Sequence, residues 1–592
     1  MGQSTLTAMN GTPDTTETLR FGPFELDVRS RELRKGRTCV RLQEQPFEIL
    51  RMMLERPGLV VTRDELCSRL WPNGTFVDFE HSLNAAVKRL RAALGDEADN
   101  PRFVETLPRR GYRFIAMLDA AEEALTVAAG AVGHRVRMAV MPFTIVGDEP
   151  GQEYFADGLT EEMIAQLGQL CRGRIGVIAR SSSMMFKRST QRAREIGQAL
   201  RADYLLEGSV RQEGDRVRIT ARLVETSGET HLWIETYERH LADCLSVQAD
   251  VAARIAQSLA MELMPEQSRG AHATSQDANA YQAYLKARFH WNKPGDEGVD
   301  EAIDYYEQSL AMDPAFAAAY AGIARARILR AEYYGDVPRR VLELARHSAK
   351  RALELEPSLS EAHLALAEVR RTLEWDWRGA ESSYSQAIVL NPSHEGAHRS
   401  FGVMLATLSR NEEAIRESER ACELDPLCLV VNSSAAWVRY VAGDYDQAIK
   451  RCRHTVGMNP RFVLARRVLA AAYLQSGRED SAIQSLDATF AQAGEDPVLM
   501  AWLAHAKAVV GDRDEARGLV ARLIALREKR FVPAFHVALA HVGLDDHDAA
   551  FAALEQATVE CDPALPNVAV DPRFEPIRSD ARYSRLIELL GL

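Results

Sequence analysis

Residues 83–116 read LNAAVKRLRAALGDEADNPRFVETLPRRGYRFIA and combine a cationic helix pattern with a hairpin pattern. In the first part, apolar residues recur at i, i+4, i+7 and i+11, which predicts a helix with one buried face. In the second part, apolar and polar residues alternate on both sides of two adjacent arginines. This pattern predicts a tight β-hairpin with a basic tip.

Positive charge is concentrated around this stretch. Residues 20–117 contain 18 basic and 14 acidic side chains, a net charge of +4. Because the whole chain has a net charge of −12, the remaining residues carry a net charge of −16. A basic block on an acidic chain is typical of a module that binds a polyanion, because neutralised phosphates supply sequence-independent affinity. A solvated charged face is the alternative that composition leaves open.

The segments before this stretch predict a compact order of elements. Alternation of apolar and polar residues in 21–42 predicts a small antiparallel sheet, and the helical spacing of Phe47, Leu50 and Leu54 predicts a first helix. Thr62 followed by Glu65 forms a capping-box pattern, so a second short helix is expected to start there. In the third helix, Asn84, Lys88 and Arg91 lie opposite the apolar face, which suits a helix in a major groove.

This order of sheet, three helices and hairpin resembles the winged-helix DNA-binding domain of OmpR/PhoB-type transcriptional regulators, over residues 19–117. The motifs RLRAALGD and ETLPRRGYRF carry the resemblance, which is closer to the CadC/ToxR branch. The resemblance implies that the third helix contacts bases through Asn84, Lys88 and Arg91. It also implies phosphate contacts from His81 and Arg89, and wing contacts from Arg109, Arg110 and Arg113. Pro108 stands where many phosphorylated regulators carry an arginine, which puts the wing contact in question. A winged helix that makes only protein contacts is the alternative.

The middle of the chain predicts a small α/β domain. Residues 135–265, between linkers at 118–134 and 266–276, alternate strand and helix patterns, then give antiparallel strands and a last helix from Ser246. The segments YFADGLTEEMI and ADYLLEGSVRQEGDRVRITARLV resemble a TolB/FlgO-like module. Ser181, Ser182 and Ser183 lie near Lys187 without the spacing of a nucleophile motif, and a serine-rich turn after a strand is the expected reading.

The C-terminal half repeats with a period of 34 residues. One alanine recurs in each repeat, with successive spacings of 43, 35 and then 34, at Ala302, Ala345, Ala380, Ala414, Ala448, Ala482, Ala516 and Ala550. This period is that of tetratricopeptide repeats, in which a small residue lets two helices approach closely. Prolines are expected to stop the second helices, at Pro314, Pro357, Pro392, Pro426, Pro460, Pro497 and Pro563. About eight helix pairs over residues 277–592 should form a solenoid whose groove binds a peptide or partner helix, or which serves dimerisation alone.

No sequence pattern indicates catalysis, a cofactor or a metal. Walker, GxGxxG and GxSxG motifs are absent, and the eight cysteines form no CxxC pair. Residues 1–18 are expected to be a disordered tail with no receiver domain, and no apolar run is long enough to span a bilayer, so a cytoplasmic protein is expected.

The expected fold is therefore multidomain α+β: a winged helix-turn-helix, a small α/β domain and an all-α tetratricopeptide solenoid. The expected function is that of a non-enzymatic transcriptional regulator that binds double-stranded promoter DNA, with repeats that bind a protein partner or self-associate. The join of winged helix and repeats resembles HilA-type activators, which makes the loop from Trp71 to Glu80 a candidate RNA polymerase contact. The alternatives are a signalling scaffold and a cyclase-associated signalling protein.

Overall fold

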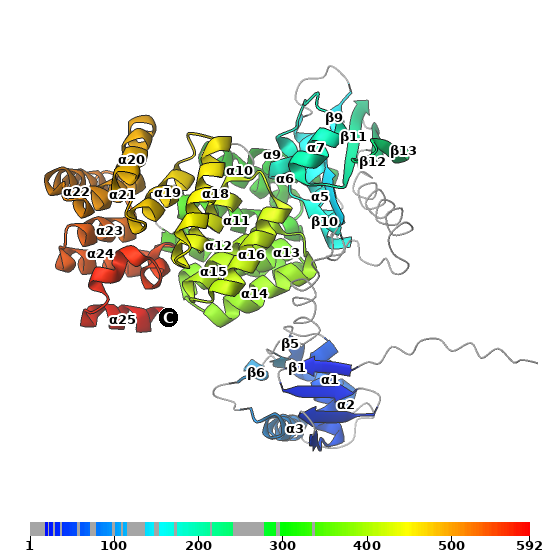
Figure 1. The fold of residues 1–592 in the computed structure, drawn as a ribbon. Coiled ribbons are helices and arrows are strands. Elements are labelled where there is room, and N and C mark those ends of the chain that lie inside the picture. The colour runs from blue at the N-terminus through cyan, green and yellow to red at the C-terminus, as the bar shows by residue number, and fades with distance from the viewer. Residues whose placement is uncertain are drawn as a thin grey trace, which may run out of the picture. The chain divides into compact units, whose positions relative to one another are not determined.

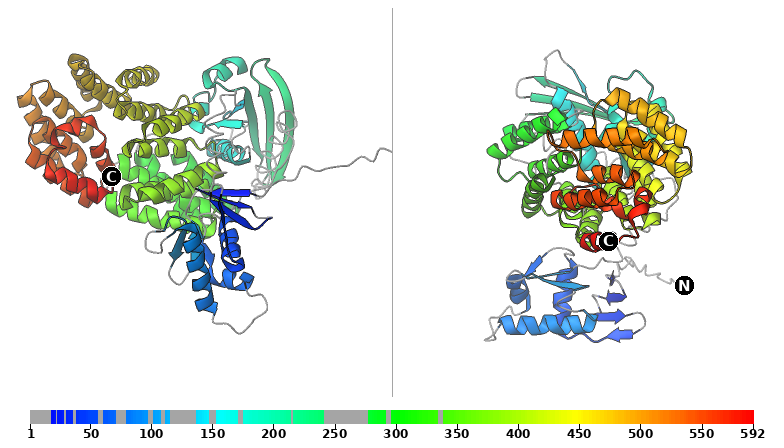
Figure 2. Two further views of the ribbon diagram at one scale, coloured as in Figure 1. Left: turned by 60° about the horizontal axis from the view of Figure 1, so that its bottom comes forward. Right: turned by 90° about the vertical axis from the view of Figure 1, so that its left-hand side faces the viewer.

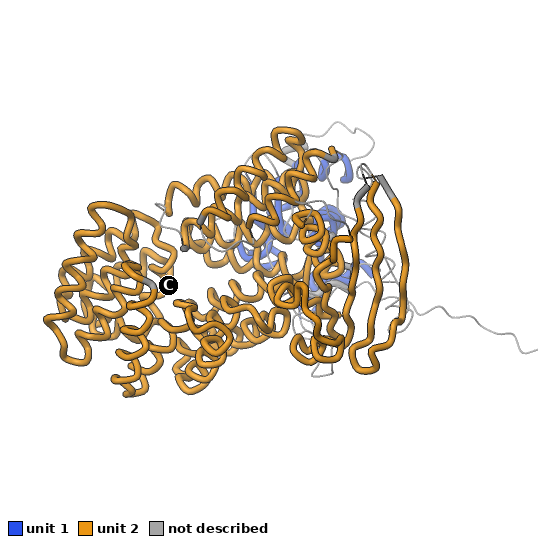
Figure 3. The backbone as a smooth tube through the Cα atoms, turned by 90° about the horizontal axis from the view of Figure 1, so that it is seen from above, with its two compact units in different colours: residues 1–133 blue, residues 134–592 orange. Residues whose placement is uncertain are grey.

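The computed structural model describes most of the chain in two compact units, Met1–Gly133 and His134–Leu592 (Figure 3). The described residues are 18–21, 23–27, 30–35, 38–55, 60–70, 79–96, 101–107, 111–114, 136–146, 153–170, 175–213, 216–240, 277–291, 296–333 and 338–592. The predicted helix from Ser246 and the two predicted linkers lie outside these residues.

The first unit begins with a four-stranded antiparallel sheet and continues with three helices (Figure 1). The strands, in their order in the sheet, are β1 (Thr18–Phe21), β2 (Phe24–Asp27), β3 (Glu32–Lys35) and β4 (Thr38–Val40). The helices are α1 (Glu44–Glu55), α2 (Arg63–Leu70) and α3 (Phe79–Leu94). The predicted capping box is confirmed, because the Thr62 amide donates to Glu65 Oε2 at 2.8 Å and the Glu65 amide donates to Thr62 Oγ1 at 3.2 Å.

A second, three-stranded sheet carries the wing. Its order is β5 (Val60–Thr62), β7 (Gly111–Phe114), β6 (Val104–Leu107), and all its pairings are antiparallel. The buried carboxylate of Asp96 accepts the amide hydrogens of Phe103 at 3.3 Å and Val104 at 2.8 Å, which fixes the turn between α3 and β6. One apolar core, whose described members lie between Phe21 and Phe114, joins both sheets and the three helices.

The second unit opens with the small α/β domain, called the module below (residues 136–240). Its sheet has the order β10 (Ile175–Ile178), β8 (Val136–Val140), β11 (Tyr204–Glu213), β12 (Arg216–Glu225), β13 (Thr230–His240), and β9 (Thr144–Ile145) also pairs with β11. The pairings of β8 with β10 and β11 are parallel, and those of β12 are antiparallel. The helices are α5 (Glu153–Leu170), α6 (Arg180–Met184) and α7 (Ala193–Leu200). Figure 2 shows β11, β12 and β13 as one long curved ribbon.

The rest of the second unit, residues 277–592, is an all-helical solenoid. Eight successive pairs can be followed through the described residues: α9 (Ala278–Trp291) with α10 (Asp296–Met312), α11 (Ala317–Tyr333) with α12 (Pro338–Leu355), α13 (Ser360–Val369) with α14 (Trp377–Leu390), α15 (Glu395–Thr407) with α16 (Asn411–Leu424), α17 (Leu429–Val441) with α18 (Tyr445–Met458), α19 (Val463–Gln475) with α20 (Glu479–Ala493), α21 (Pro497–Val509) with α22 (Arg513–Arg527), and α23 (Ala534–Gly543) with α24 (His547–Glu560). A π-helical turn, η2 (Arg370–Glu374), extends α13. Two 3-10 turns, η3 (Leu565–Ala569) and η4 (Pro572–Ile577), lead to a last helix, α25 (Ala581–Leu590).

The predicted repeat alanines all lie in the second helix of a pair, and each is fully buried. Their spacing therefore identified the helix contacts correctly, and the multidomain α+β fold class is confirmed. One predicted helix stop is wrong: Pro497 is the first residue of α21 and does not end α20, which stops at Ala493. The physical reason is that proline lacks an amide hydrogen, and the first helical position needs none.

The module and the solenoid share one core. Met138, Val177 and Leu206 of the sheet and Phe155 and Leu159 of α5 belong to one buried cluster with solenoid residues. The solenoid residues come from its first helices and include Tyr281, Tyr284, Leu285, Phe316 and Ile323. The module therefore completes its interior with α9, α10 and α11.

Hydrogen bonds join the module to a second place in the solenoid. Asp425, at the end of α16, is 2% exposed and accepts hydrogen bonds from the Ser181 hydroxyl, the Ser182 hydroxyl at 2.6 Å and the Ser182 amide at 3.1 Å. The Leu427 amide donates back to Ser182 Oγ at 2.8 Å, and the Ala179 amide donates to the Leu424 carbonyl at 2.7 Å. The serine cluster is thus part of a structural junction. We call this set of contacts the Asp425 junction.

The C-terminal segment, residues 565–592, contacts repeats that are far from it in sequence. Trp377 Nε1 donates to the Leu590 carbonyl at 2.7 Å, and the Tyr440 hydroxyl donates to Asp571 Oδ1 at 3.0 Å. The guanidinium of Arg573 lies 3.7 Å from the ring centre of Trp502. The segment therefore occupies surface on the third, fifth and seventh helix pairs. No helix within the described part of the chain has the length and apolar character needed to cross a membrane.

Candidate nucleic-acid interface

The polar face of α3 borders the wing hairpin in the first unit. Asn84 is exposed, and its Oδ1 accepts hydrogen bonds from the Tyr112 hydroxyl on β7 at 2.7 Å and from Arg63 of α2 at 3.2 Å. The Arg63 guanidinium also lies 5.3 Å from the ring centre of Tyr112. These three side chains set the position of α3 relative to α2 and the wing. Arg63 and Tyr112 lie within the predicted second helix and the predicted hairpin, but neither was predicted as a site residue.

Lys88 and Arg89 lie further along α3 and are both exposed. Lys88 makes no hydrogen bond or ion pair with another described residue. Arg89 donates to Gln43 Oε1, just before α1, at 2.6 Å. A free ammonium and a guanidinium held by a single neutral partner leave positive charge available to a phosphate or a base edge.

Arg91 and Arg113 are directed at the wing itself. Arg91 donates to the Val104 carbonyl at 2.7 Å and to the Thr106 hydroxyl at 2.8 Å, both on β6. Arg113 donates through Nε to Glu105 Oε2 at 2.8 Å, across the β6–β7 pair. In this structure Arg91 therefore ties α3 to the wing, and the charge of Arg113 is balanced by a carboxylate.

The remaining predicted contacts cannot be placed. Arg109 and Arg110, at the tip of the hairpin, lie outside the described residues, as do residues 71–78 of the predicted polymerase-contact loop. His81 belongs to α3, but its side chain is not described. The interface that the structure describes therefore consists of the exposed side of α3 and the base of the wing. In the described residues no group of His, Cys, Asp and Glu is arranged to hold a metal ion.

Comparison with known families identifies three segments. Residues 36–114 match the family "Transcriptional regulatory protein, C terminal", residues 134–254 match "HilA/YgeH-like transcriptional regulator, second domain", and residues 441–499 match "Tetratricopeptide repeat". The second match agrees with the predicted HilA-type architecture. The third lies within the solenoid.

Several known proteins resemble parts of the chain. A "Putative adenylate cyclase 3" of Rhizobium meliloti is 31% identical over 251 residues, which are 42% of this chain and 42% of that protein. The "Cholera toxin homolog transcriptional activator" of Vibrio parahaemolyticus is 37% identical over 99 residues, 16% of this chain and 34% of that protein. The crystal structure of the Klebsiella pneumoniae RstA DNA-binding domain in complex with RstA box is 30% identical and covers 17% of this chain and 96% of that one, with a TM-score of 0.15.

The chain spans between about a third and two fifths of the length of these curated relatives. Their shared segments and the family matches agree with the architecture seen in the structure. The chain carries an OmpR/PhoB-type winged-helix domain, a HilA/YgeH-like second domain and tetratricopeptide repeats, in that order.

Proposed function

We propose that the protein is a transcriptional regulator that binds promoter DNA through the first unit. The observation that carries this proposal is the exposed surface formed by Asn84, Lys88 and Arg89 on α3, beside the wing of a domain that matches transcriptional regulators. A helix of this size fits the major groove, where amide and cationic side chains distinguish base pairs. We further propose that the protein acts in the cytoplasm.

Individual roles follow from the contacts of each side chain. Asn84 and Lys88 read base edges, and His81 and Arg89 contact phosphates. Arg91 holds the wing against α3, and its guanidinium reaches DNA only if it leaves Val104 and Thr106. Arg109 and Arg110 supply the wing's positive charge to the DNA backbone or a minor groove, and Arg113 adds to it only if it leaves Glu105.

The second unit supplies regulation in this proposal. The solenoid binds a protein partner or a second copy of the chain, and the module passes the state of the solenoid to the rest of the protein. The loop from Trp71 to Glu80 is a candidate contact for RNA polymerase. Occupancy of the promoter and transcriptional output are therefore separable properties.

DNA binding by a fragment of residues 18–117 tests the central claim. The fragment contains the complete apolar core of the first unit, so it should fold alone. Its affinity for duplex DNA should fall steeply with salt, because cationic contacts release counterions from the phosphates. Genome-wide footprinting of the tagged full chain would supply the operator. A folded fragment whose binding shows no salt dependence contradicts the proposal.

Paired substitutions separate base reading from general charge. Lys88→Ala should weaken operator binding by about 1–3 kcal/mol, whereas Lys35→Ala, which removes an equal charge on β3, should have a much smaller effect. Asn84→Ala should relax discrimination at one base position, and Arg110→Ala should weaken all sequences evenly. Competition binding across single-base operator variants measures these differences. Equal losses from Lys88→Ala and Lys35→Ala would show that α3 has no special role.

The relative named as an adenylate cyclase supports a second candidate function, a cyclase-associated signalling protein. In that case the solenoid and module would act without sequence-specific DNA binding. Footprinting distinguishes the two, because a signalling scaffold gives no reproducible operator.

A further inference from the structure

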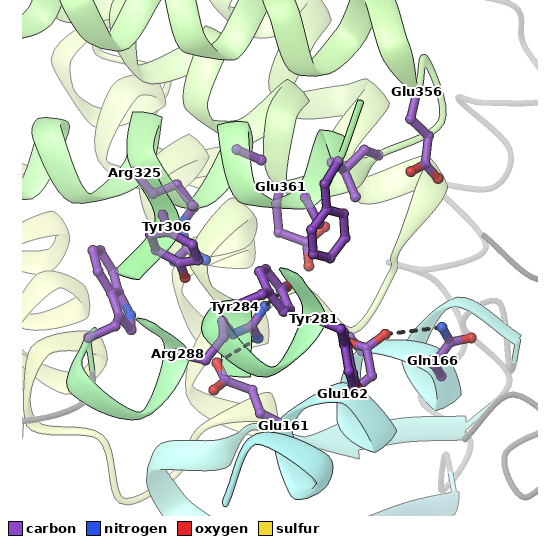
Figure 4. A pocket seen from close by; sticks show the side chains of 17 residues that line it. Glu161, Glu162, Gln166, Tyr281, Tyr284, Arg288, Tyr306, Arg325, Glu356 and Glu361 are labelled. Carbon is purple, nitrogen blue, oxygen red and sulfur yellow. Dashed lines mark hydrogen bonds and ion pairs between the residues drawn. The ribbon is translucent and has the colours of Figure 1, made fainter. Parts of the chain in front are cut away.

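The contact between the module and the first repeats forms a partly open cavity, whose empty space is about 770 Å³ when the open solvent at its mouth is counted (Figure 4). It lies between α5 of the module and helices α9, α10, α11 and α13 of the solenoid. Aromatic side chains form much of its wall: Tyr281, Tyr284, Trp291, Tyr306 and Phe316. None of these residues belongs to the proposed DNA interface, which lies in the other unit.

The charged groups of the cavity do not balance. Four glutamates and two arginines line it, a formal charge of −2: Glu161, Glu162, Glu356, Glu361, Arg288 and Arg325. Arg288 is already paired with Glu161 at 2.6 Å and also donates to the Tyr284 hydroxyl at 2.7 Å. Arg325 makes no ion pair with another described residue and lies 5.4 Å from the ring centre of Trp291. Besides the Arg288–Glu161 pair, the carboxylates of Glu162 and Glu361 and the guanidinium of Arg325 line the cavity.

Glu361 is the group whose surroundings point to a ligand. Glu361 lies in the first turn of α13. Its Oε2 atom is buried and has no hydrogen-bond partner among the described residues. Burial raises the pKa of Glu361, but its interactions with His394, Arg288 and Arg325 lower that pKa by more, so the carboxylate is ionised at neutral pH. A buried ionised oxygen without a partner is costly unless a donor fills the site.

Glu162, on α5, stands across the cavity from Glu361, and among the described residues it hydrogen-bonds to a neutral side chain. Gln166 Nε2 donates to Glu162 Oε1 at 3.1 Å (Figure 4). Burial raises the pKa of Glu162, and a cation bound beside this carboxylate would favour its charged form. Carboxylates from both sides of the contact, combined with electron-rich rings, are the groups that recognise an organic cation.

We propose that this cavity binds a small organic cation, an alkylammonium or alkylguanidinium, with its charged group between Glu361 and Glu162 and its carbon chain against the tyrosine rings. The ligand would bridge the module and the solenoid, because each supplies one of the two carboxylates. Binding would therefore stiffen the contact between the two parts of the second unit. This site does not depend on the DNA-binding proposal.

Calorimetric titration of the full chain with a matched series of probes tests the charge requirement. Pentylamine and agmatine should bind and raise the melting temperature, whereas neutral pentanol should bind at least about tenfold more weakly and pentanoate should not bind. An acetylated and amidated tripeptide with a central arginine tests the source of the cation. Tighter binding of the tripeptide than of agmatine would overturn the free small molecule in favour of a protein side chain.

Variants with opposite expected effects distinguish recognition from loss of fold. Glu361→Gln and Glu162→Gln should each weaken agmatine binding about tenfold or more, while Arg325→Gln, which removes a like charge, should strengthen it. Glu412→Gln, an exposed carboxylate on α16, is the matched control and should change nothing. Equal binding of pentanol and pentylamine, unchanged affinity in Glu361→Gln, or absence of binding by either cation at millimolar concentration would overturn the proposal.

Discussion

The winged-helix domain and the module are two small α/β regions of one chain, but they close their cores in different ways. In the first unit, the buried cluster is built entirely between Phe21 and Phe114. In the module, the cluster includes Tyr284, Leu285 and Phe316, which belong to the solenoid. A region of this size buries enough apolar surface to fold alone only if its own elements cover its sheet. The difference shows that a boundary between sequence families need not be a boundary between folding units.

Truncation should give the largest effect and tests the comparison directly. A chain ending at residue 133 should keep salt-sensitive DNA binding, because the first unit is complete. A chain ending at residue 276 should bind DNA but expose the apolar side of α5 and of the module sheet, so the module should aggregate or lose its structure. Circular dichroism, proteolysis and DNA titration on both chains measure this. A stable module in the longer truncation would show that its core closes without the repeats.

Asp425→Ala should give the next largest effect, a loss of about 3 kcal/mol in the stability of the second unit. The substitution leaves the hydroxyl and the amide of buried Ser182 without their acceptor, and buried unpaired donors are costly; the exposed Ser181 hydroxyl also loses its acceptor. Asp446→Ala removes an aspartate that is exposed on α18 and serves as the control. Urea denaturation of residues 134–592 reports the stability. Equal free energies of unfolding for Asp425→Ala and Asp446→Ala would show that the Asp425 junction adds nothing to stability.

Gly158→Ala should weaken the contact between α5 and α9 by about 1–3 kcal/mol. A Cβ atom at Gly158 would lie 2.7 Å from Leu285 Cδ2, so the two helices would have to move apart. Gly518→Ala on α22 is the matched control, because no atom lies within 4 Å of its added Cβ. The control should stabilise its helix by up to about 1 kcal/mol, since alanine has the higher helix propensity. Urea denaturation measures the change in the free energy of unfolding for each variant. Changes of opposite sign support the close contact between α5 and α9, and changes of the same sign argue against it.

The smallest expected effect concerns a buried carboxylate inside the repeats, away from the module. Burial raises the pKa of Asp562 to about 6, whereas an unfolded aspartate has its ordinary lower value. As the pH falls from 7 to 5, the folded state takes up a proton that the unfolded state does not, so this group adds about 1 kcal/mol of stability. Asp562→Asn should remove that gain.

Hydrogen exchange in α23, corrected for the intrinsic rate, measures the Asp562 effect locally. The Phe535 amide at the start of α23 donates to Asp562 at 3.1 Å, so protection of this helix reports the carboxylate. The gain at low pH should persist in Asp425→Ala, because Asp562 is not part of the Asp425 junction. Loss of the gain in that variant would show that the module stabilises even the last repeats.

Local patterns predicted the three helices and the hairpin of the first unit and the helix pairs of the second, but not β5 or the short helix α6, where a serine-rich turn was expected. The 34-residue alanine period gave the second helices, and each of these alanines is buried, because one helix contact recurs in every repeat. The polar face of α3 was also predictable, since Asn84, Lys88 and Arg91 recur at helical spacing. Pro497 was misread because proline precedes one helix as readily as it follows another.

The direction of individual side chains could not be predicted. Arg91 has the spacing of a DNA-facing residue, but its guanidinium bonds to Val104 and Thr106 of β6. That choice depends on where the wing strand passes α3, which no local period encodes. Arg63 was missed for the same reason, because its partner Asn84 lies 21 residues further along the chain.

The sequence by itself determined the order of the three regions, the repeat period, the basic character of the first unit and the face that α3 presents. These properties follow from near-neighbour spacing and from composition. Only the tertiary structure decided that the module shares its core with the solenoid, that Ser182 meets Asp425 across 243 residues, and that Glu162 and Glu361 face one cavity. Such contacts depend on how the repeats curve in space, and that curvature is the sum of many small helix-packing angles.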